Sequence, residues 1–242
     1  MNSFAQYSDV LLDGFTSNTK SLEVISKKHN ILQDVLTYHD LQKDNILFVG
    51  FSPWCLGMGT IPFKIAEVSD RVLAYLDNQG CQFQVQSLSD LTPLRKSASI
   101  VVATDEYFTF SDSDVGQRML VNCLAEVAKD VIVTTLRDYK NQDFKDREFS
   151  QPVLIRNSSQ RKIYLEHYDY DTKDKNASMS RTYVFDGDVN SMHGPFSRRN
   201  MYFKQLAKFS IDAGARNFYV HKNLMYKSVI KKNYEHVITI KF

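Results

Sequence analysis

The segment Asn45–Ser69 constrains the fold of this 242-residue chain more than any other part of the sequence. It begins with Ile46–Val49, a continuous apolar run that predicts a strand buried on both faces. A turn starts at Gly50, and a second apolar run, Phe63–Ala66, is followed by the acid Glu67. A strand, a glycine turn, a short helix, a second strand and an acid form the layout of a nucleotide-binding βαβ unit.

Two residues of this unit carry its chemistry. Gly50 lets the backbone of the turn approach a ligand closely, because glycine has no side chain in the way. Glu67 ends the second strand, where its carboxylate can accept hydrogen bonds from both hydroxyls of a ribose. The pair predicts a ligand site at the carboxyl ends of these strands.

Further strands and helices alternate along the next 70 residues. Ser69 is placed to cap a helix over Asp70–Asn78, which ends before Gly80. Alternation of apolar and polar residues predicts a strand at Cys81–Gln86, and apolar runs predict strands at Ala98–Ala103 and Val131–Thr135. Helical spacing predicts a helix from Ser111 or Ser113 to about Ala128. This α/β alternation predicts a doubly wound, mainly parallel sheet.

The pattern changes in the last 90 residues. Three segments predict antiparallel strands in an insertion at about residues 150–190: Pro152–Arg156, Arg161–Tyr168 and Arg181–Phe185. A helix is then expected from about Arg198 to Ala213, before Gly214. Two closing strands, Asn217–His221 and His236–Phe242, form an expected antiparallel C-terminal pair.

Residues 1–44 are predicted to be an N-terminal helical segment ahead of a single domain, residues 45–242. Residues 1–14 are weakly patterned and are expected to form an arm or one short helix. From about Ser17 or Asn18, apolar residues recur at helical spacing: Leu22, Ile25, Leu32, Val35 and Leu36. This helix has two readings, an amphipathic helix packed on the domain or a lid over an active site.

Composition excludes several classes of protein. The net charge of +2 argues against a dominant polyanion-binding surface, although a basic C-terminal third around Arg198, Lys208 and Lys231 leaves nucleic acid open as a ligand. The three cysteines have no metal-ligand spacing, so we expect reduced thiols and no metal site. Neither a signal peptide nor an apolar run of about 18 residues is apparent. We expect a soluble cytoplasmic protein with no membrane partner.

The segment from Ile46 to Ser69 resembles the first half of a class I, Rossmann-like, S-adenosylmethionine-dependent methyltransferase. Members of that family place a glycine-rich turn after strand one, an acid at the end of strand two and often a serine before the next helix. The resemblance implies S-adenosylmethionine as cofactor. It assigns cofactor contacts to eight positions: Gly50, Phe51, Ser52, Glu67, Val68, Ser87, Leu88 and Thr104. The family's usual GxGxG turn is replaced here by Gly50-Phe51-Ser52-Pro53-Trp54, in which Pro53 lacks an amide donor.

Four residues are the catalytic candidates. Asp105, Glu106 and Tyr107 follow a buried strand, at the edge where open α/β sheets bind ligands. Either carboxylate could remove a proton from the methyl acceptor, or all three could simply open a loop. His193 precedes the last predicted helix, where family members often contact substrate, and a surface role is its alternative.

Three functions remain open from the sequence. The first is methyl transfer from S-adenosylmethionine to an unidentified acceptor, either a small molecule or a nucleic acid. The second is a catalytically inactive methyltransferase-like domain that acts as an interaction or assembly module with a protein partner. The third is a nicotinamide-dependent oxidoreductase. Its phosphate-binding turn would lose more from the missing amide of Pro53 than a turn that binds S-adenosylmethionine, which has no phosphates.

Overall fold

The computed structural model describes residues 3–16, 31–42, 44–67, 69–88, 90–103, 105–109, 111, 113–137, 153–156, 161–169, 179–186, 192–227 and 234–242. Its helices are α1 (Ser3–Thr16), a helix at 31–38, α3 (Asp70–Asn78), α4 (Asp105–Thr109), α5 (Asp114–Val127) and α6 (Phe203–Asp212), with short 3₁₀ helices at Pro53–Met58 and Thr92–Leu94. No helix of these described segments is long and apolar enough to cross a bilayer.

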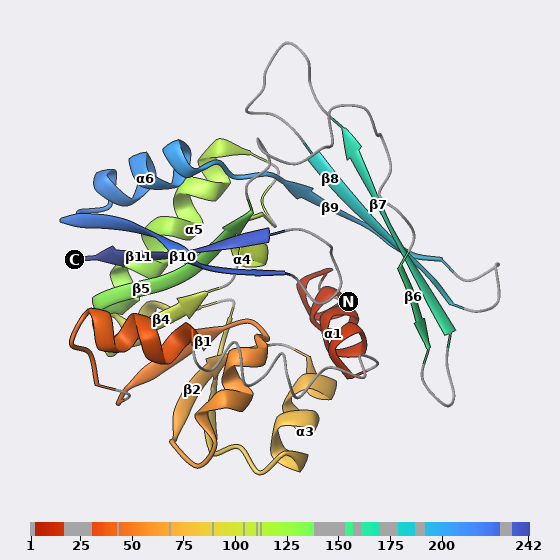
Figure 1. The fold of residues 1–242 in the computed structure, drawn as a ribbon, viewed down its shortest axis with the longest axis horizontal. Coiled ribbons are helices and arrows are strands. Elements are labelled where there is room, and N and C mark those ends of the chain that lie inside the picture. Colours follow the sequence, from red (N-terminus) through yellow and green to blue (C-terminus); the bar gives the residue numbers. More distant parts are fainter. Residues whose placement is uncertain are drawn as a thin grey trace.

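The central layer is a seven-stranded sheet in the order β10-β11-β5-β4-β1-β2-β3 (Figure 1). Its strands are β1 (Ile46–Val49), β2 (Phe63–Ala66), β3 (Phe83–Gln86), β4 (Ala98–Ala103), β5 (Ala128–Arg137), β10 (Asn217–Lys227) and β11 (Tyr234–Lys241). The first five run parallel, while β11 is antiparallel to both β5 and β10. This confirms the predicted doubly wound α/β fold with an antiparallel C-terminal strand pair.

The sheet is buried because its strands present apolar side chains to both faces. In β1, Ile46 and Phe48 face a core shared with α3 and the helix at 31–38, whereas Leu47 and Val49 face a second core shared with α5 and α6. All four side chains are at most 1% exposed. Continuous apolar runs of this kind are what a sheet covered on both sides requires.

Two serines begin helices as expected. The Ser69 hydroxyl accepts a hydrogen bond of 3.2 Å from the amide of Val72 at the start of α3. The Ser113 hydroxyl accepts one of 3.1 Å from the amide of Gly116 at the start of α5. Each bond satisfies an amide that has no partner inside its helix, so these caps fix where the helices begin.

A second, antiparallel sheet in the order β6-β7-β8-β9 stands beside α1 (Figure 1). Its strands are β6 (Val153–Arg156), β7 (Arg161–Asp169), β8 (Met179–Asp186) and β9 (Met192–Arg199). The expected helix start at about Arg198 is wrong: Arg198 lies in β9, and α6 begins only at Phe203. Pro195 is tolerated in β9 because this is an edge strand whose register shifts between Thr182 and Val184 of its partner.

The N-terminal segment contains two helices in its described part. The helix at 31–38 packs in the core through Leu32, Val35 and Leu36, each at most 2% exposed. Leu22 and Ile25, which the predicted longer helix includes, lie outside the described residues. The division into residues 1–44 and 45–242 therefore stays a prediction.

Candidate functional site

The turn after β1 and the end of β2 are joined directly. The amide of Gly50 donates a hydrogen bond of 2.9 Å to the carbonyl of Ala66, the residue before Glu67. Gly50 has a φ of +76°, a conformation that favours glycine. The sequence-predicted glycine and acid thus meet at the carboxyl edge of the parallel sheet, the edge at which such sheets bind ligands.

The rest of the turn has limited hydrogen-bonding capacity. The Ser52 hydroxyl accepts a bond of 3.2 Å from the amide of Trp54, so it caps the 3₁₀ helix that follows. Pro53 has no amide donor. Within the described part of the chain, no hydrogen bond is made by the backbone amides of Phe51 and Ser52. These two amides are the donors that the turn could offer to a carboxylate.

Glu67 is buried at 3% exposure and is held on both carboxylate oxygens. Its Oε1 accepts a bond of 3.0 Å from the amide of Ser69, and its Oε2 accepts one of 3.0 Å from the hydroxyl of Ser8. The first bond comes from the loop that leads into α3. The second comes from α1, near the start of the chain.

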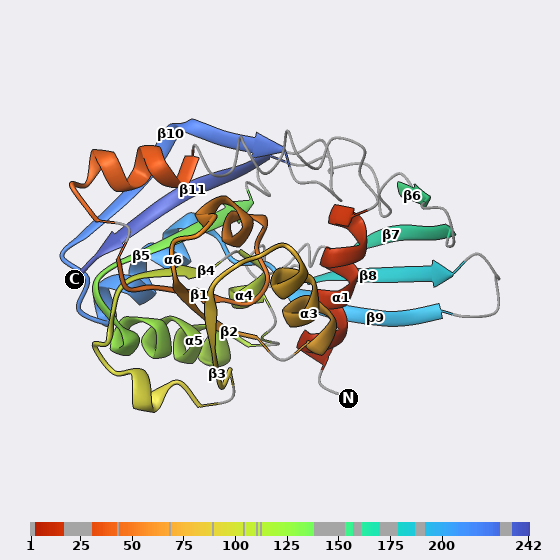
Figure 2. The ribbon, with the colours of Figure 1, turned by 90° about the horizontal axis from the view of Figure 1, so that it is seen from below.

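Helix α1 lies against the loop from β2 to α3 and the second sheet, as the view from below shows (Figure 2). Asp9 accepts a hydrogen bond from the Ser69 hydroxyl. Asp13 pairs with Arg71 of α3 at 2.6 Å and with Lys162 of β7. The sequence prediction missed this helix as part of the site. The signal that could have revealed it is the spacing of Phe4, Ser8, Leu12 and Phe15, which form one helical stripe.

Asp13 is held as a carboxylate. Burial by itself would raise its pKa, but the hydrogen bonds and charges of Arg71 and Lys162 outweigh burial and lower the pKa below its ordinary value. A buried carboxylate with two cationic partners joins three separate elements: α1, α3 and β7. It therefore fixes where the C-terminal half of α1 lies.

Tyr107 is in α4, directly after β4, and is 7% exposed. Its ring meets the ring of Phe4 edge to face, with centroids 6.5 Å apart. Burial, the neighbouring Cys123 and the hydrogen bond between these two side chains raise the pKa of Tyr107, so its hydroxyl stays protonated at neutral pH. Asp105 and Glu106 open the same helix, and their side chains lie outside the described part. All three catalytic roles stay predictions.

The other predicted positions are more scattered. Ser87 is exposed and Leu88 is half-buried just beyond β3, where Leu88 packs against the core that contains Tyr107. His193 lies in β9 opposite Val184, in the second sheet and not in the parallel one. Val68 and Thr104 fall outside the described residues. The structure therefore brings together Gly50, Phe51, Ser52 and Glu67, and it adds Tyr107 through Phe4.

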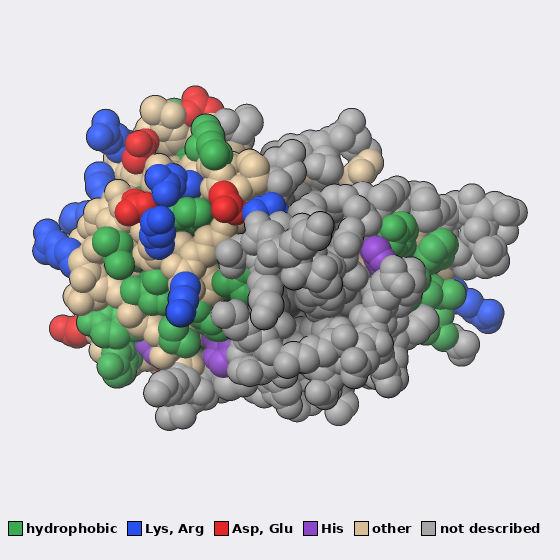
Figure 3. Space-filling model, turned by 90° about the horizontal axis from the view of Figure 1, so that it is seen from above, with side chains coloured by type: hydrophobic (Ala, Val, Ile, Leu, Met, Phe, Trp, Pro, Cys, Tyr) green, Lys and Arg blue, Asp and Glu red, His purple; other side chains and the backbone are tan. Residues whose placement is uncertain are grey.

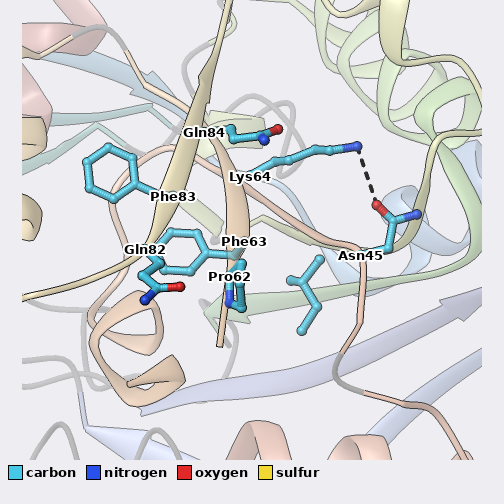
Figure 4. A pocket seen from close by; sticks show the side chains of 8 residues that line it. Asn45, Pro62, Phe63, Lys64, Gln82, Phe83 and Gln84 are labelled. Carbon is cyan, nitrogen blue, oxygen red and sulfur yellow. Dashed lines mark hydrogen bonds between the residues drawn. The ribbon is translucent and has the colours of Figure 1, made fainter. Parts of the chain in front are cut away.

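A shallow surface pocket of about 320 Å³ lies at the opposite, amino end of β1, β2 and β3 (Figure 4). Asn45, Lys64, Gln82 and Gln84 line it with Pro62 and two phenylalanines, and Lys64 Nζ lies 3.4 Å from Asn45 Oδ1. The predicted cofactor residues are at the other ends of these strands. The pocket is therefore separate from the candidate site.

The surface on the side of α6 carries charges of both signs (Figure 3). Arg118 of α5 pairs with Asp212 of α6 at 3.2 Å, and both side chains are more than 40% exposed. Such mixed, exposed charges are typical of a solvated surface. Within the described residues, no group of three or more His, Cys, Asp or Glu side chains could hold a metal ion.

The comparisons with solved structures concern the fold. A S-adenosylmethionine-dependent methyltransferase from Clostridium acetobutylicum superposes with a TM-score of 0.62 at 11% identity, over 92% of this chain and 95% of the other. The CcbJ methyltransferase from Streptomyces caelestis gives 0.59 at 12% identity, over 90% and 96% of the two chains. CalS10, an amino pentose methyltransferase from Micromonospora echinaspora with bound cofactor, gives 0.54 at 13% identity, over 89% and 92%.

No protein-family model and no curated protein sequence matches the chain. The similarity to the solved structures extends over about nine tenths of the chain. It therefore includes both the parallel strands and the antiparallel C-terminal strands of the sheet. The chain therefore has the fold of class I S-adenosylmethionine-dependent methyltransferases.

Proposed function

We propose that this protein transfers a methyl group from S-adenosylmethionine to an acceptor that remains to be identified. One observation carries the proposal: Glu67 stands at the end of β2 beside the Gly50 turn, and the Gly50–Ala66 hydrogen bond holds the two together. An acid and a glycine turn in this relationship suit a ligand that has a ribose and a charged end. Proteins of the same fold are S-adenosylmethionine-dependent methyltransferases.

The chemistry of the donor set fits this cofactor. Glu67 would accept hydrogen bonds from the ribose hydroxyls. The amides of Phe51 and Ser52 would donate to the carboxylate of its methionine part, which needs fewer donors than a pyrophosphate does. Leu88 would contact the adenine. The cofactor supplies an activated methyl group on a sulfonium, so the protein has mainly to align the acceptor and exclude water.

Asp105 and Glu106 are our candidates for deprotonating the acceptor. They begin α4 directly after β4, and β4 is the parallel neighbour of β1, whose carboxyl end leads into the Gly50 turn. Their position in the chain, directly after β4, suits a general base or a group that holds an acceptor amine or hydroxyl. Tyr107, with its raised pKa, would contribute as a donor and not as a base.

The first test is binding of S-adenosylhomocysteine to the purified protein, measured by titration calorimetry and by thermal unfolding. We expect saturable binding and a rise in Tm, because a ligand of the native state stabilises it. Glu67→Ala should abolish both, whereas Glu126→Ala, which removes an exposed glutamate of α5, should change neither. Unchanged affinity in a folded Glu67→Ala protein would contradict the site.

The inactive, partner-binding module is the second candidate. The commitment of Ser52 to capping and the absence of an amide at Pro53 favour it, since both reduce the donors available in the turn. A well-folded protein that binds no S-adenosylhomocysteine would select this candidate. Any methyl transfer by the purified protein would exclude it.

A further inference from the structure

Helix α1 crosses the candidate site from one core to the other. Phe4, near its start, packs against the core that contains Tyr107. Leu12 and Phe15, near its end, belong to the opposite core, where the Phe15 ring meets those of Phe51 and Tyr75 at 6.2 Å and 6.4 Å. A helix that touches both cores at the carboxyl edge of the sheet must pass over the strand ends.

Side chains of α1 contact both proposed ligand-binding positions, Glu67 and Gly50. The Ser8 hydroxyl occupies Oε2 of Glu67, the carboxylate expected to receive ribose hydroxyls. The Phe4 ring covers Gly50 so closely that a Cβ at that position would lie 2.8 Å from Phe4 Cζ. The backbone approach that a glycine permits is thus taken by this chain's own side chain.

We infer that α1 is an autoinhibitory gate, which occupies the cofactor site and must leave it before S-adenosylmethionine binds. This inference rests on the proposed function. The structure is then the closed state, and an open state with α1 displaced is the one that binds cofactor. Because only the open fraction binds, the apparent dissociation constant equals the intrinsic constant divided by that fraction.

Contacts remote from the ligand hold the gate closed. Asp13 is five residues, or about one and a half helical turns, from Ser8 along α1, and its two cations belong to α3 and β7. Removing its charge would leave both cations without this partner and weaken closure without altering Gly50, Phe51, Ser52 or Glu67. Asp13→Asn therefore separates the gate from the cofactor contacts.

Titration of S-adenosylhomocysteine into wild type and Asp13→Asn tests the gate. We expect about tenfold tighter binding by Asp13→Asn, because its open fraction is larger. Asp114→Asn is the matched control: it removes an aspartate that pairs with Arg199 at 2.9 Å. Asp114 lies on α5, which packs against the other core from α3, and the variant should bind as wild type does. Equal affinities of wild type and Asp13→Asn would refute the gate but would not contradict the proposed cofactor site.

Amide hydrogen exchange gives a second readout. If α1 must leave, then adding S-adenosylhomocysteine to wild type should speed exchange in α1 while slowing it in β1 and the Gly50 turn. Increased protection of α1 on binding would overturn the gate, since it would mean that α1 closes over the ligand. Absence of binding in wild type, Asp13→Asn and Asp114→Asn alike would refute the proposed function, and with it the gate.

Discussion

The hydroxyl of Ser8 donates a hydrogen bond of 3.0 Å to Oε2 of Glu67, although the two residues are 59 positions apart in the chain. The proposed cofactor site depends on Glu67, and Ser8 lies on α1, the helix that covers this site. A hydrogen bond to a buried carboxylate is worth about 1.5–3 kcal/mol. The bond therefore couples the position of α1 to the availability of Glu67.

Ser8→Ala removes this coupling. We expect the variant to bind S-adenosylhomocysteine roughly tenfold more tightly than wild type, because a loss of about 1.4 kcal/mol from the closed state changes the equilibrium tenfold. Thr16→Val is the control on the same helix. Among the described residues, its hydroxyl bonds only to carbonyls of α1, at 3.0 Å and 3.3 Å, so its loss should leave affinity unchanged. Equal effects of the two substitutions would rule out a specific role for Ser8.

Gly50→Ala should open α1. The new Cβ would meet the Phe4 ring, and the φ of +76° adds a backbone cost of about 1–2 kcal/mol. Gly80→Ala is the control, since Gly80 has a similar φ of +73° but nothing within 4 Å of an added Cβ. Thermal unfolding and hydrogen exchange should show both variants destabilised, with α1 exposed only in Gly50→Ala. The double variant Gly50→Ala/Phe4→Ala should also leave the amides of α1 exposed to exchange, because it lacks the Phe4 ring that anchors this helix.

The sequence predicts the parallel sheet well because its central strands are apolar runs, such as Ile46–Val49 and Ala98–Ala103. The Ser69 cap and the Gly50 turn could be predicted because they depend on local chemistry, while the cofactor role of Glu67 stays a prediction. β9 was missed because Gly194-Pro195 is typical of a turn, and only its edge position allows it in a strand.

The spacing of Phe4, Ser8, Leu12 and Phe15 indicates a helix, but it does not indicate which residues that helix contacts. Helix α1 is covered on more than one side, so Tyr7, Val10 and Leu12 are all buried and the contrast between an apolar and a polar face is weak. Its contacts with Glu67, Ser69 and Arg71 bridge about 60 residues of sequence. No spacing rule within one helix can indicate partners that tertiary structure alone brings together.

A histidine pair links the helix at 31–38 to the C-terminal strands and makes stability depend on pH. His39, 8% exposed, lies with its ring centroid 5.5 Å from that of His221 and 5.2 Å from that of Tyr219. Burial, followed by the charges of Lys241 and His221, lowers the pKa of His39 to about 4. In the unfolded chain its pKa is about 6.5.

Between these two values the unfolded chain binds a proton that the folded chain does not. Stability should therefore fall as pH falls from about 6.5 to about 4, by up to about 3 kcal/mol, and His39 should contribute no further loss below pH 4. His39→Phe keeps an aromatic ring but cannot titrate. Denaturant unfolding at a series of pH values should show a smaller slope for this variant, and parallel curves for the two proteins would contradict the assignment.

Gln117 joins α5 to the segment that leads into α6. Gln117 is fully buried. Its Nε2 donates a hydrogen bond of 2.9 Å to the Arg199 carbonyl, and its Oε1 accepts one of 3.1 Å from Gln205 Nε2. Gln117→Leu would remove the donor to the Arg199 carbonyl, whereas Gln205 Nε2 keeps its bond of 2.8 Å to Asp114. The variant should cost about 1–3 kcal/mol, lowering Tm by a few degrees. Gln33→Leu, which removes an exposed bond to Thr37, should cost less than about 0.5 kcal/mol. Comparable losses in the two variants would show that the Gln117 bonds contribute little.

The most direct test of the cofactor site uses a protein in which the gate is already weakened. S-adenosylhomocysteine should be titrated into Asp13→Asn and into Asp13→Asn/Glu67→Gln, with circular dichroism to establish that both are folded. The account predicts saturable binding by the first protein and binding at least about tenfold weaker by the second, since the amide cannot accept from both ribose hydroxyls as a carboxylate does. Equal affinities, or no binding by the folded Asp13→Asn protein, would contradict it.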